Sequence, residues 1–350
     1  VEYPCLCLVA SMMVRQGMNT TKCLSIQVGR TACGRMGQIR KSNEIVNEMV
    51  MVRTFYRVGD FNYCVDFRDN RNTEKLLGSS QSFKISASEA EKEPLLFELV
   101  VDDAWRPIQK GKEIGIFDCG GNNHGVYVLE DGSYQILVCD VNDNHCCLMQ
   151  ATSDFSSATV CLNGNENMRS FGLNNALMMM YAFSSSDKMT VLMHSSVVRK
   201  EGRGYLCLGV SGTGKSTHTS NWLKYIQGTE LINDDNPVVR VFANGDIRVF
   251  GSPWSGKTPC YKNVFAEVAG FLQLKQAPYN RIERMSIVDG FVALLPSCSV
   301  MKWDRRDYVG VCDTVSKMLE QIPVFFLENL PNEEACRLSY SMLSGEKDYA

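Results

Sequence analysis

Short hydrophobic runs alternate with polar turns along residues 54–162. Runs of this length, with turn residues between them, are typical of β-strands. The predicted strands lie at 55–57, 63–67, 95–101, 125–129, 134–138, 145–150 and 158–162. The turn sequence EDGS at 130–133 indicates a hairpin between two of them. We therefore predict a small antiparallel β-rich domain over residues 51–164, with no catalytic cluster in its sequence.

The pattern changes after residue 164. Residues 168–183 are apolar around most of a helix, which predicts a mostly buried helix whose methionines fill the core. Beyond it, short apolar strands alternate with helical segments, which predicts an α/β domain over residues 165–345. The predicted strands are 190–193, 196–199, 205–208, 231–233, 238–242, 246–250, 268–274 and 324–327, and the predicted helices cover 216–226, a segment from Ser286 toward Leu295, and a closing segment from Asn332.

Residues 1–50 share neither pattern. They contain four cysteines, five methionines and six Lys or Arg residues, but no Asp. We expect that this leader is not a folded unit and that the native product starts near Met49 or Met51. The alternative is a cleaved targeting segment, although the opening VEYPCLCLVASMM lacks the basic region that precedes the apolar stretch of a signal peptide.

Composition narrows the class of protein. With 350 residues, 45% of them hydrophobic and 21% charged, the chain is typical of a globular protein with room for two domains. The net charge of −3 argues against nucleic acid as the main partner. No apolar run reaches the roughly 18–20 residues of a membrane span, so we expect no membrane partner and a cytoplasmic location.

Fifteen cysteines are many for a cytosolic chain, but none of them forms a C-x-x-C pair. Cys5 and Cys7, like Cys146 and Cys147, are too close in sequence for an ordinary zinc knuckle. Thiols stay reduced in the cytosol. We therefore expect most of the cysteines to be small buried hydrophobic residues.

One loop has the acidic character of a metal site. The segment CDVNDNH at 139–145 contains Asp140, Asp143 and His145. It lacks the central Gly and terminal Glu of a calcium-binding loop. We therefore predict a solvated turn here.

The strongest sequence signal is GVSGTGKST at 209–217, which fits the phosphate-binding pattern G-x-x-x-x-G-K-[ST]. Its glycines let the backbone curl so that N–H groups point at phosphate oxygens. Lys215 would add a positive charge at the β and γ phosphates, and the Ser216 hydroxyl could bind Mg²⁺. A predicted strand precedes the loop and a predicted helix follows it, which is the context that the motif requires. The candidate nucleotide-binding residues are Gly209, Ser211, Gly212, Thr213, Gly214, Lys215, Ser216 and Thr217.

Further candidates flank this loop in the sequence. Asp234 and Asp235 end the next predicted strand, 18 and 19 positions after Ser216, where proteins with such loops keep the acidic group that orients the metal. One carboxylate can hold Mg²⁺ or its water while the other accepts a proton from an attacking hydroxyl; the alternative is a turn or helix-cap pair. His194 ends a strand 22 positions before Ser216. It is either a sensor of phosphate charge or protonation, or an ordinary polar residue at a strand end.

These segments resemble the kinase domain of the HPr kinase/phosphorylase family. The resemblance covers roughly residues 190–345 and is carried by MHSSVVRKEGRGYLCLGVSGTGKST at 193–217 and LINDDNPVV at 231–239. It implies a P-loop fold whose core is similar to that of phosphoenolpyruvate carboxykinase, with ATP and Mg²⁺ as cofactors. By this resemblance Asp234, with Ser216, would hold the metal, Asp235 would be the catalytic base, and His194 would modulate the site.

The chain departs from that family at GSPWSGKTPC, residues 251–260. The family carries a metal-binding Glu in the comparable loop, whereas no acidic residue occurs here between Asp246 and Glu267. This difference argues against phosphorylase activity and against HPr as the substrate. The stretch is either a second anion-binding turn that uses Lys257 or a structural turn with a buried Trp254.

Together these observations predict a Mg-ATP-dependent phosphotransferase whose acceptor is a protein serine or a small-molecule hydroxyl. Arg281 and Arg284 are either transition-state stabilisers or solvated arginines. The alternatives are a nucleotide-binding regulatory module with little turnover and a lyase similar to phosphoenolpyruvate carboxykinase, which would need a larger N-terminal domain. The phosphoryl donor and the oligomeric state stay open, with a homo-oligomer among the alternatives.

Overall fold

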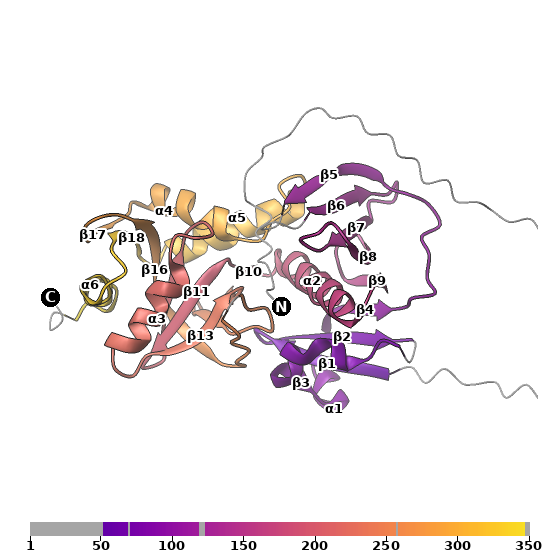
Figure 1. Ribbon diagram of the computed structural model, residues 1–350, viewed down its shortest axis with the longest axis horizontal. Helices are drawn as coiled ribbons and strands as arrows, with labels where there is room; N and C mark the ends of the chain where they lie inside the picture. The colour runs from indigo at the N-terminus through magenta and orange to yellow at the C-terminus, as the bar shows by residue number, and fades with distance from the viewer. Residues whose placement is uncertain (1–51, 69–70, 119–122, 257, 347–350) are drawn as a thin grey trace, which may run out of the picture.

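The computed structural model of the protein describes residues 52–68, 71–118, 123–256 and 258–346. Two large mixed β-sheets with helices against them make up this part of the chain (Figure 1). The protein is therefore of the mixed α/β class. The predictions for residues 1–50, including a start near Met49 or Met51, lie outside the described residues.

The first sheet has nine strands in the order β3-β1-β2-β4-β9-β8-β7-β6-β5. Strands β5 to β9 are paired antiparallel in chain order. The turn at 130–133 predicts the hairpin of β6 and β7, whereas β5 was not among the predicted strands. The strands are β1 (Val52–Val58), β2 (Phe61–Phe67), β3 (Lys84–Ile85), β4 (Leu95–Val101), β5 (Lys112–Asp118), β6 (Asn123–Val128), β7 (Tyr134–Cys139), β8 (His145–Ala151) and β9 (Ser157–Leu162).

The prediction of an antiparallel sheet is wrong at the centre of this sheet. Strand β4 pairs in parallel with both β2 and β9. Parallel neighbours need a long crossover. The segment between β2 and β4 contains a 3₁₀ helix, η1 (Glu74–Phe83), and a short helix, α1 (Ala87–Ala90). Such a crossover leaves no local turn signal of the kind that marks a hairpin.

The long helix α2 (Glu166–Ser185) packs against the first sheet. Asn165 caps its start, because its side chain accepts the N–H of Met168. Fifteen of its twenty residues are buried, which confirms the mostly buried helix expected from the sequence. The predicted domain boundary at 164/165 stays a prediction; α2 follows it in the chain, and its core is shared with the strands that precede it.

The second sheet also has nine strands and carries the candidate site. Its main order is β10-β14-β15-β16-β12-β11-β13, and β18 joins β16 in parallel and pairs with β17. The strands are β10 (Thr190–Leu192), β11 (Ser195–Lys200), β12 (Arg203–Leu208), β13 (Glu230–Asp235), β14 (Val238–Val241), β15 (Ile247–Phe250), β16 (Phe265–Gln276), β17 (Arg281–Arg284) and β18 (Val324–Asn329).

Helices cover both faces of this sheet (Figure 1). One face packs against α4 (Ile287–Leu294), the short η2 (Leu295–Ser297) and α5 (Arg305–Leu319). The other face packs against α3 (Lys215–Tyr225) and α6 (Glu333–Ser344), where Trp222 and Tyr340 meet edge to face. Helix α5 was not among the predicted elements.

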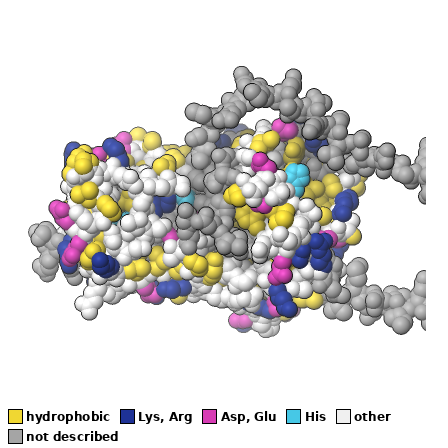
Figure 2. Space-filling view, viewed as in Figure 1, with side chains coloured by type: hydrophobic (Ala, Val, Ile, Leu, Met, Phe, Trp, Pro, Cys, Tyr) yellow, Lys and Arg dark blue, Asp and Glu magenta, His cyan; other side chains and the backbone are white. Residues whose placement is uncertain are grey.

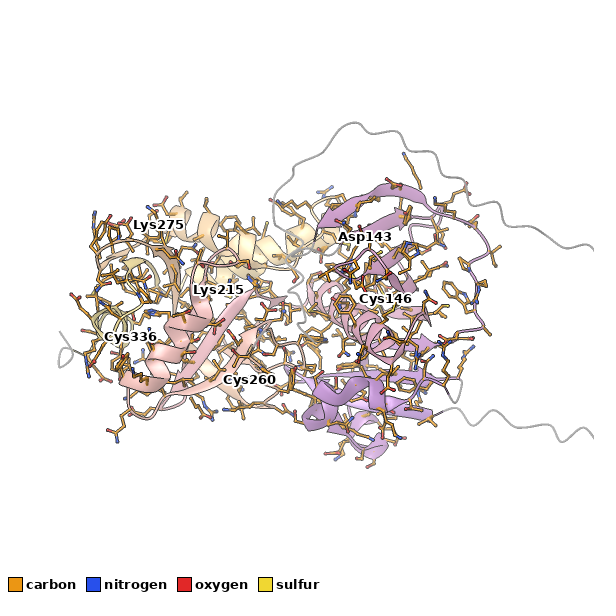
Figure 3. The ribbon with its side chains drawn as sticks, in the orientation of Figure 1. Asp143, Cys146, Lys215, Cys260, Lys275 and Cys336 are labelled. Carbon is orange, nitrogen blue, oxygen red and sulfur yellow. The ribbon has the colours of Figure 1, made fainter. Side chains whose placement is uncertain are left out.

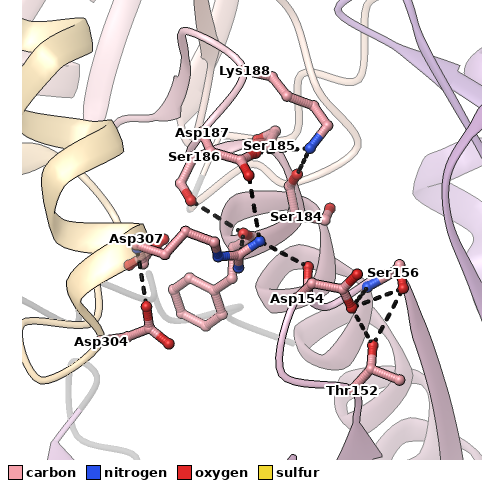
Figure 4. A network of polar contacts seen from close by, with 12 residues as sticks. Thr152, Asp154, Ser156, Ser184, Ser185, Ser186, Asp187, Lys188, Asp304 and Asp307 are labelled. Carbon is pink, nitrogen blue, oxygen red and sulfur yellow. Dashed lines mark hydrogen bonds and ion pairs between the residues drawn. The ribbon is translucent and has the colours of Figure 1, made fainter.

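We call residues up to the end of α2 the first part of the chain and the residues from β10 onward the second part. A polar network joins the start of α5, in the second part, to the first part (Figure 4). Tyr134 on β7 donates its hydroxyl proton to Asp304 Oδ2 at 2.9 Å. The guanidinium of Arg306 donates to the carbonyl oxygens of Asp154 and Phe183, at 3.2 and 3.0 Å. These bonds tie the two sheets to one another through one helix end.

Asp307, whose side chain is fully buried, belongs to this network, because its backbone N–H donates to Asp304 Oδ1 at 3.0 Å (Figure 4). One of its carboxylate oxygens accepts the backbone N–H of Met301. Burial, which disfavours the charged form, raises the pKa of Asp307 to about 7. The joint between the two parts therefore contains an acid that titrates close to neutral pH.

The surface charges and the burial of the cysteines match what the composition predicts. On the visible face, basic and acidic side chains are interspersed (Figure 2). Within the described ranges no helix combines the length and the hydropathy that crossing a membrane requires. Eight of the ten described cysteines are buried and all ten are free thiols, as the small-hydrophobe interpretation expects.

Candidate functional site

The second sheet brings the predicted residues to one edge. Strand β11 lies between β12 and β13 and is antiparallel to both, so the carboxyl ends of β12 and β13 lie at the same edge. The glycine loop follows β12, and Asp234 and Asp235 end β13 opposite Ser196 and Ser195. His194 directly precedes β11 at this edge. Pairing register, rather than sequence proximity, therefore assembles the site.

The loop after β12 requires glycine at three positions. Gly209, Gly212 and Gly214 have φ values of 144°, 85° and 97°, where L side chains are strained. At Gly209 an added Cβ would also lie 2.5 Å from Thr213 Oγ1. Gly214 is the N-cap of α3, and no side chain caps that end. The first turn of α3 thus leaves its N–H groups and its positive dipole end for an anion.

Lys215 is held at the mouth of this loop, although it is the first residue of α3. Its side chain is buried, and its ammonium donates to the Gly209 carbonyl at 2.8 Å. The same Nζ lies 2.8 Å from His194 Nε2, and His194 Nδ1 lies 2.8 Å from Asp235 Oδ1. An ammonium can only donate and a carboxylate can only accept. These partners therefore assign His194 as the neutral tautomer with its proton on Nδ1. Figure 3 labels Lys215 in this part of the molecule.

The two aspartates are held differently. Asp234 is buried, and its Oδ1 accepts the Ser216 hydroxyl at 2.9 Å. Asp235 is partly exposed, and its Oδ2 accepts from Asn236 Nδ2 at 3.0 Å. Its backbone φ of 151° lies in a region that residues with a Cβ rarely adopt. Strain of this kind, at about 1–3 kcal/mol, is concentrated at functional positions.

The donor set beside the loop fits Mg²⁺ together with a nucleotide. A hydroxyl and a carboxylate oxygen, already 2.9 Å apart on Ser216 and Asp234, are hard ligands of the type that Mg²⁺ prefers. Mg²⁺ keeps several waters and takes the rest of its ligands from phosphates. Two protein ligands are thus consistent with the finding that the described residues contain no cluster of three His, Cys, Asp or Glu side chains arranged for a metal.

A second segment, residues 252–256, supports the two aspartates, a role that the sequence analysis did not predict for it. The backbone of Asp235 bridges to Ser255, and the Ser255 hydroxyl and the Gly256 N–H both donate to the Asp234 carbonyl. Ser252 donates its hydroxyl proton to the Asn236 carbonyl at 2.6 Å. The segment therefore positions the end of β13. Its small polar residues were the available signal, but only the fold places them against β13.

The sequence left two interpretations of residues 251–260, an anion-binding turn and a structural turn, and the structure bears on the second. Trp254 is buried, with 5% of the residue exposed, which agrees with a structural turn around a buried Trp. Its ring packs against Tyr181 of α2, with the centroids 5.3 Å apart. Lys257, the anion-binding candidate of the other interpretation, lies outside the described residues.

An open hollow lies beside the glycine loop. Residues 210–213 line one side of it, and residues 273–276 with Phe326 line the other. Gln276 donates to the Gly212 carbonyl at 3.0 Å, so β16 steadies the loop. Within the loop, Thr213 donates to the Val210 carbonyl, whereas Ser211 and Thr217 are exposed. The structure thus gathers the loop, Lys215, Ser216 and Asp234 at one edge.

Two other groups of candidates lie apart from this cluster. Arg281 and Arg284 are exposed on β17, where Arg281 forms an ion pair with Glu283 at 3.0 Å. Neither arginine lines the hollow beside the loop. In the acidic loop of the first part, Asp140 accepts the N–H groups of Asn142 and Asn144, as the predicted turn requires.

Comparison with known proteins adds no assignment: no protein-family model matches the chain, and neither does any curated protein.

Proposed function

We propose that the protein is a nucleotide-dependent phosphotransferase that moves the γ-phosphoryl group of ATP to a hydroxyl. The observation that carries this proposal is the chain of contacts from Lys215 through His194 to Asp235. It connects the cation of a glycine loop to a partly exposed carboxylate at the same sheet edge. The resemblance to the HPr kinase/phosphorylase family, and to the core of phosphoenolpyruvate carboxykinase, supports the same proposal.

The loop and α3 would bind the nucleotide phosphates. The phosphate oxygens would accept hydrogen bonds from backbone N–H groups at 209–217, and the Lys215 ammonium would add positive charge beside them. Ser216 and Asp234 would hold Mg²⁺, which neutralises charge on the phosphates when it is bound. Most of the rate enhancement in such a site comes from positioning and preorganised charge.

Asp235 is the proposed general base. In the transfer the acceptor oxygen forms a bond to the γ-phosphorus, the bond from that phosphorus to the β–γ bridging oxygen breaks, and ADP leaves with the electron pair. The acceptor proton passes to Asp235. His194 acts as a positioning residue, because its Nδ1–H holds one oxygen of the base and its Nε2 contacts Lys215.

The test is transfer of label from γ-labelled ATP to small molecules and proteins of a cell extract, with purified full-length chain. Asp235→Asn keeps the shape of the side chain but removes the base, so we expect turnover to fall roughly 10²–10⁴-fold with ATP affinity nearly unchanged. Asp246→Asn, at an exposed carboxylate bonded to Arg248, is the matched control and should leave turnover unchanged. Undiminished transfer by Asp235→Asn would refute the assignment of the base.

Two observations favour a second candidate, a nucleotide-binding regulatory module with little turnover. Both carboxylate oxygens of Asp235 are already engaged, by His194 and by Asn236, and no acidic residue occurs between Asp246 and Glu267. The two candidates differ in one measurement. Tight ATP binding without transfer to any acceptor would favour the module.

A further inference from the structure

The hollow beside the glycine loop lies on the side of the loop away from Asp235. Strands β13, β12, β16 and β18 run in the same direction, and β11, between β13 and β12, runs against them. Their carboxyl ends therefore meet at one edge of the sheet. The loop follows β12 in the middle of this row, Asp235 ends β13 on one side, and β16 and β18 line the hollow on the other. Ligands of open α/β sheets bind at such an edge.

The hollow has the size and the walls of a site for a planar group. It offers about 530 Å³ of space that water can reach, within the roughly 300–1,000 Å³ of small-molecule sites. Val210 of the loop lines one side, with 75% of the residue exposed, and Phe326 lines the other. Among the described lining residues only Lys275, labelled in Figure 3, is charged, and its ammonium is already 2.9 Å from Glu328. Two apolar walls and a paired charge suit a neutral aromatic ring better than a further phosphate.

One side chain of the hollow has a buried polar atom without a partner. Gln273 pairs in register with Phe326, so the two side chains lie on the same face of the sheet. Its Oε1 is buried and accepts no hydrogen bond from any described residue. Gln276 differs, because its amide donates to the Gly212 carbonyl. A buried acceptor is costly unless a ligand supplies the donor. The terminal torsion of a glutamine is broad, so the amide can turn its oxygen toward the hollow.

The amide of a glutamine matches one edge of adenine. Its oxygen accepts from the 6-amino group while its N–H donates to N7, which is the usual bidentate pair of this side chain with that base. Guanine and hypoxanthine carry an oxygen at position 6 beside the N7 acceptor, so the glutamine oxygen would face a second acceptor. The unpartnered Oε1 of Gln273 therefore selects a purine with an amino group at position 6.

We propose that this hollow holds the adenine base of the phosphoryl donor, between Val210 and Phe326, and that Gln273 selects adenine there. The inference rests on the proposed function, since it assigns the nucleoside end of the ATP that the loop binds. The triphosphate runs from the hollow across the loop, and its γ-phosphoryl group lies toward Asp235 at the end of β13. The base and the acceptor hydroxyl thereby occupy opposite sides of the glycine loop.

The experiment titrates the full-length protein by calorimetry with the Mg²⁺ complexes of ATP, inosine triphosphate, 7-deaza-ATP and inorganic triphosphate. A bidentate contact discriminates between bases by about 5- to 150-fold, so we expect inosine triphosphate to bind that much more weakly than ATP. The loss of N7 in 7-deaza-ATP should weaken binding at least about threefold, and the loss of the nucleoside at least about fivefold.

The outcomes separate this inference from the proposed function. Equal affinity for ATP and inosine triphosphate overturns the selection of adenine by Gln273. Equal affinity for ATP and inorganic triphosphate overturns the placement of the base in the hollow. Both results leave phosphate binding by the loop standing, whereas binding of none of the four probes overturns the proposed function and this inference with it.

A pair of variants localises the selection. Gln273→Leu removes the amide at similar volume, so it should lower ATP affinity about 5- to 150-fold, to that of inosine triphosphate, and leave the affinity for inorganic triphosphate within about twofold. Gln321→Leu makes the same change at an exposed position outside the hollow and should alter neither. An ATP-to-inosine-triphosphate ratio that Gln273→Leu leaves unchanged overturns the proposal. If Gln273→Leu does not fold, the comparison of the two nucleotides on the natural chain still decides.

Discussion

The glycine loop offers a matched pair of substitutions that tests its geometry. Gly209→Ala and Gly212→Ala both place a Cβ on a backbone with positive φ, at 144° and 85°. At Gly212 the new atom would meet no heavy atom within 4 Å. At Gly209 it would meet Thr213 Oγ1 at 2.5 Å and the Leu274 carbonyl oxygen at 3.3 Å. The two variants therefore share backbone strain and differ in steric conflict.

The expected magnitudes follow from these contacts. Positive φ costs an alanine about 1–2 kcal/mol, which both variants bear. Overpacking adds about 1–3 kcal/mol at Gly209, because backbone lies on one side and Thr213 must rotate away from the Val210 carbonyl on the other. We therefore expect Gly209→Ala to lower the free energy of unfolding of the second part by about 2–5 kcal/mol, and Gly212→Ala by about 1–2 kcal/mol.

Urea unfolding followed by tryptophan fluorescence measures this difference, since Trp222 is fully buried on α3, the helix that the loop opens. A third variant identifies the cause. Thr213→Ala removes the oxygen nearest to the new Cβ, so Gly209→Ala combined with Thr213→Ala should be less destabilised than the sum of the two single changes. Equal losses for Gly209→Ala and Gly212→Ala, or strict additivity with Thr213→Ala, would refute the close packing of the loop against its own threonine.

Two further predictions concern the joint between the sheets. Because Asp307 keeps its proton up to about pH 7 when folded but releases it near pH 4 when unfolded, the free energy of unfolding should fall as pH rises through that window, by up to about 4 kcal/mol. Asp307→Asn, which can still accept the Met301 N–H, should remove that slope; urea midpoints at pH 5, 6 and 7.5 that shift equally in both proteins would contradict the burial of this carboxyl. Tyr134→Phe deletes the hydrogen bond to Asp304 and should cost about 0.5–1.5 kcal/mol in the same assay, whereas Tyr279→Phe, which deletes a solvent-exposed hydrogen bond of 3.3 Å to Glu328, should cost less.

Local sequence patterns predicted the parts of the fold that adjacent residues determine, such as hairpins and the glycine loop. The turn at 130–133 and the alternation around it predict β6 and β7, because hairpin geometry is set by adjacent residues. The glycine spacing at 209–214 predicts a curled loop, and the structure has positive φ at all three glycines. Helix α5 was missed because its start, RRDYVG, opens with three charged residues, which hide the apolar periodicity of a buried helix face. In the fold Asp307 is nevertheless buried, and Arg306 bonds to the carbonyl oxygens of Asp154 and Phe183. The parallel pairing of β4 has no local signal.

The same distinction holds for the candidate site. Lys215, Ser216 and the aspartates could be selected from spacing, because the loop chemistry demands those residue types in that order. The contact between His194 and Asp235 depends on the register of β11 against β13, which no spacing rule provides. The support from residues 252–256 depends on tertiary packing between distant segments. Sequence reasoning therefore reached the residues proposed to bind phosphate more readily than those that position them.

The most direct test of the central claim is calorimetric titration of the full-length protein with Mg-ATP, alongside Lys215→Met. The methionine keeps the buried aliphatic stem of Lys215 and removes the ammonium that contacts His194 and Gly209. A hydrogen bond from a charged group contributes about 1.5–3 kcal/mol, so the account predicts saturable binding by the natural chain and roughly 10- to 150-fold weaker binding by the variant. Equal affinity of the two proteins for Mg-ATP, or no binding by either, would contradict it.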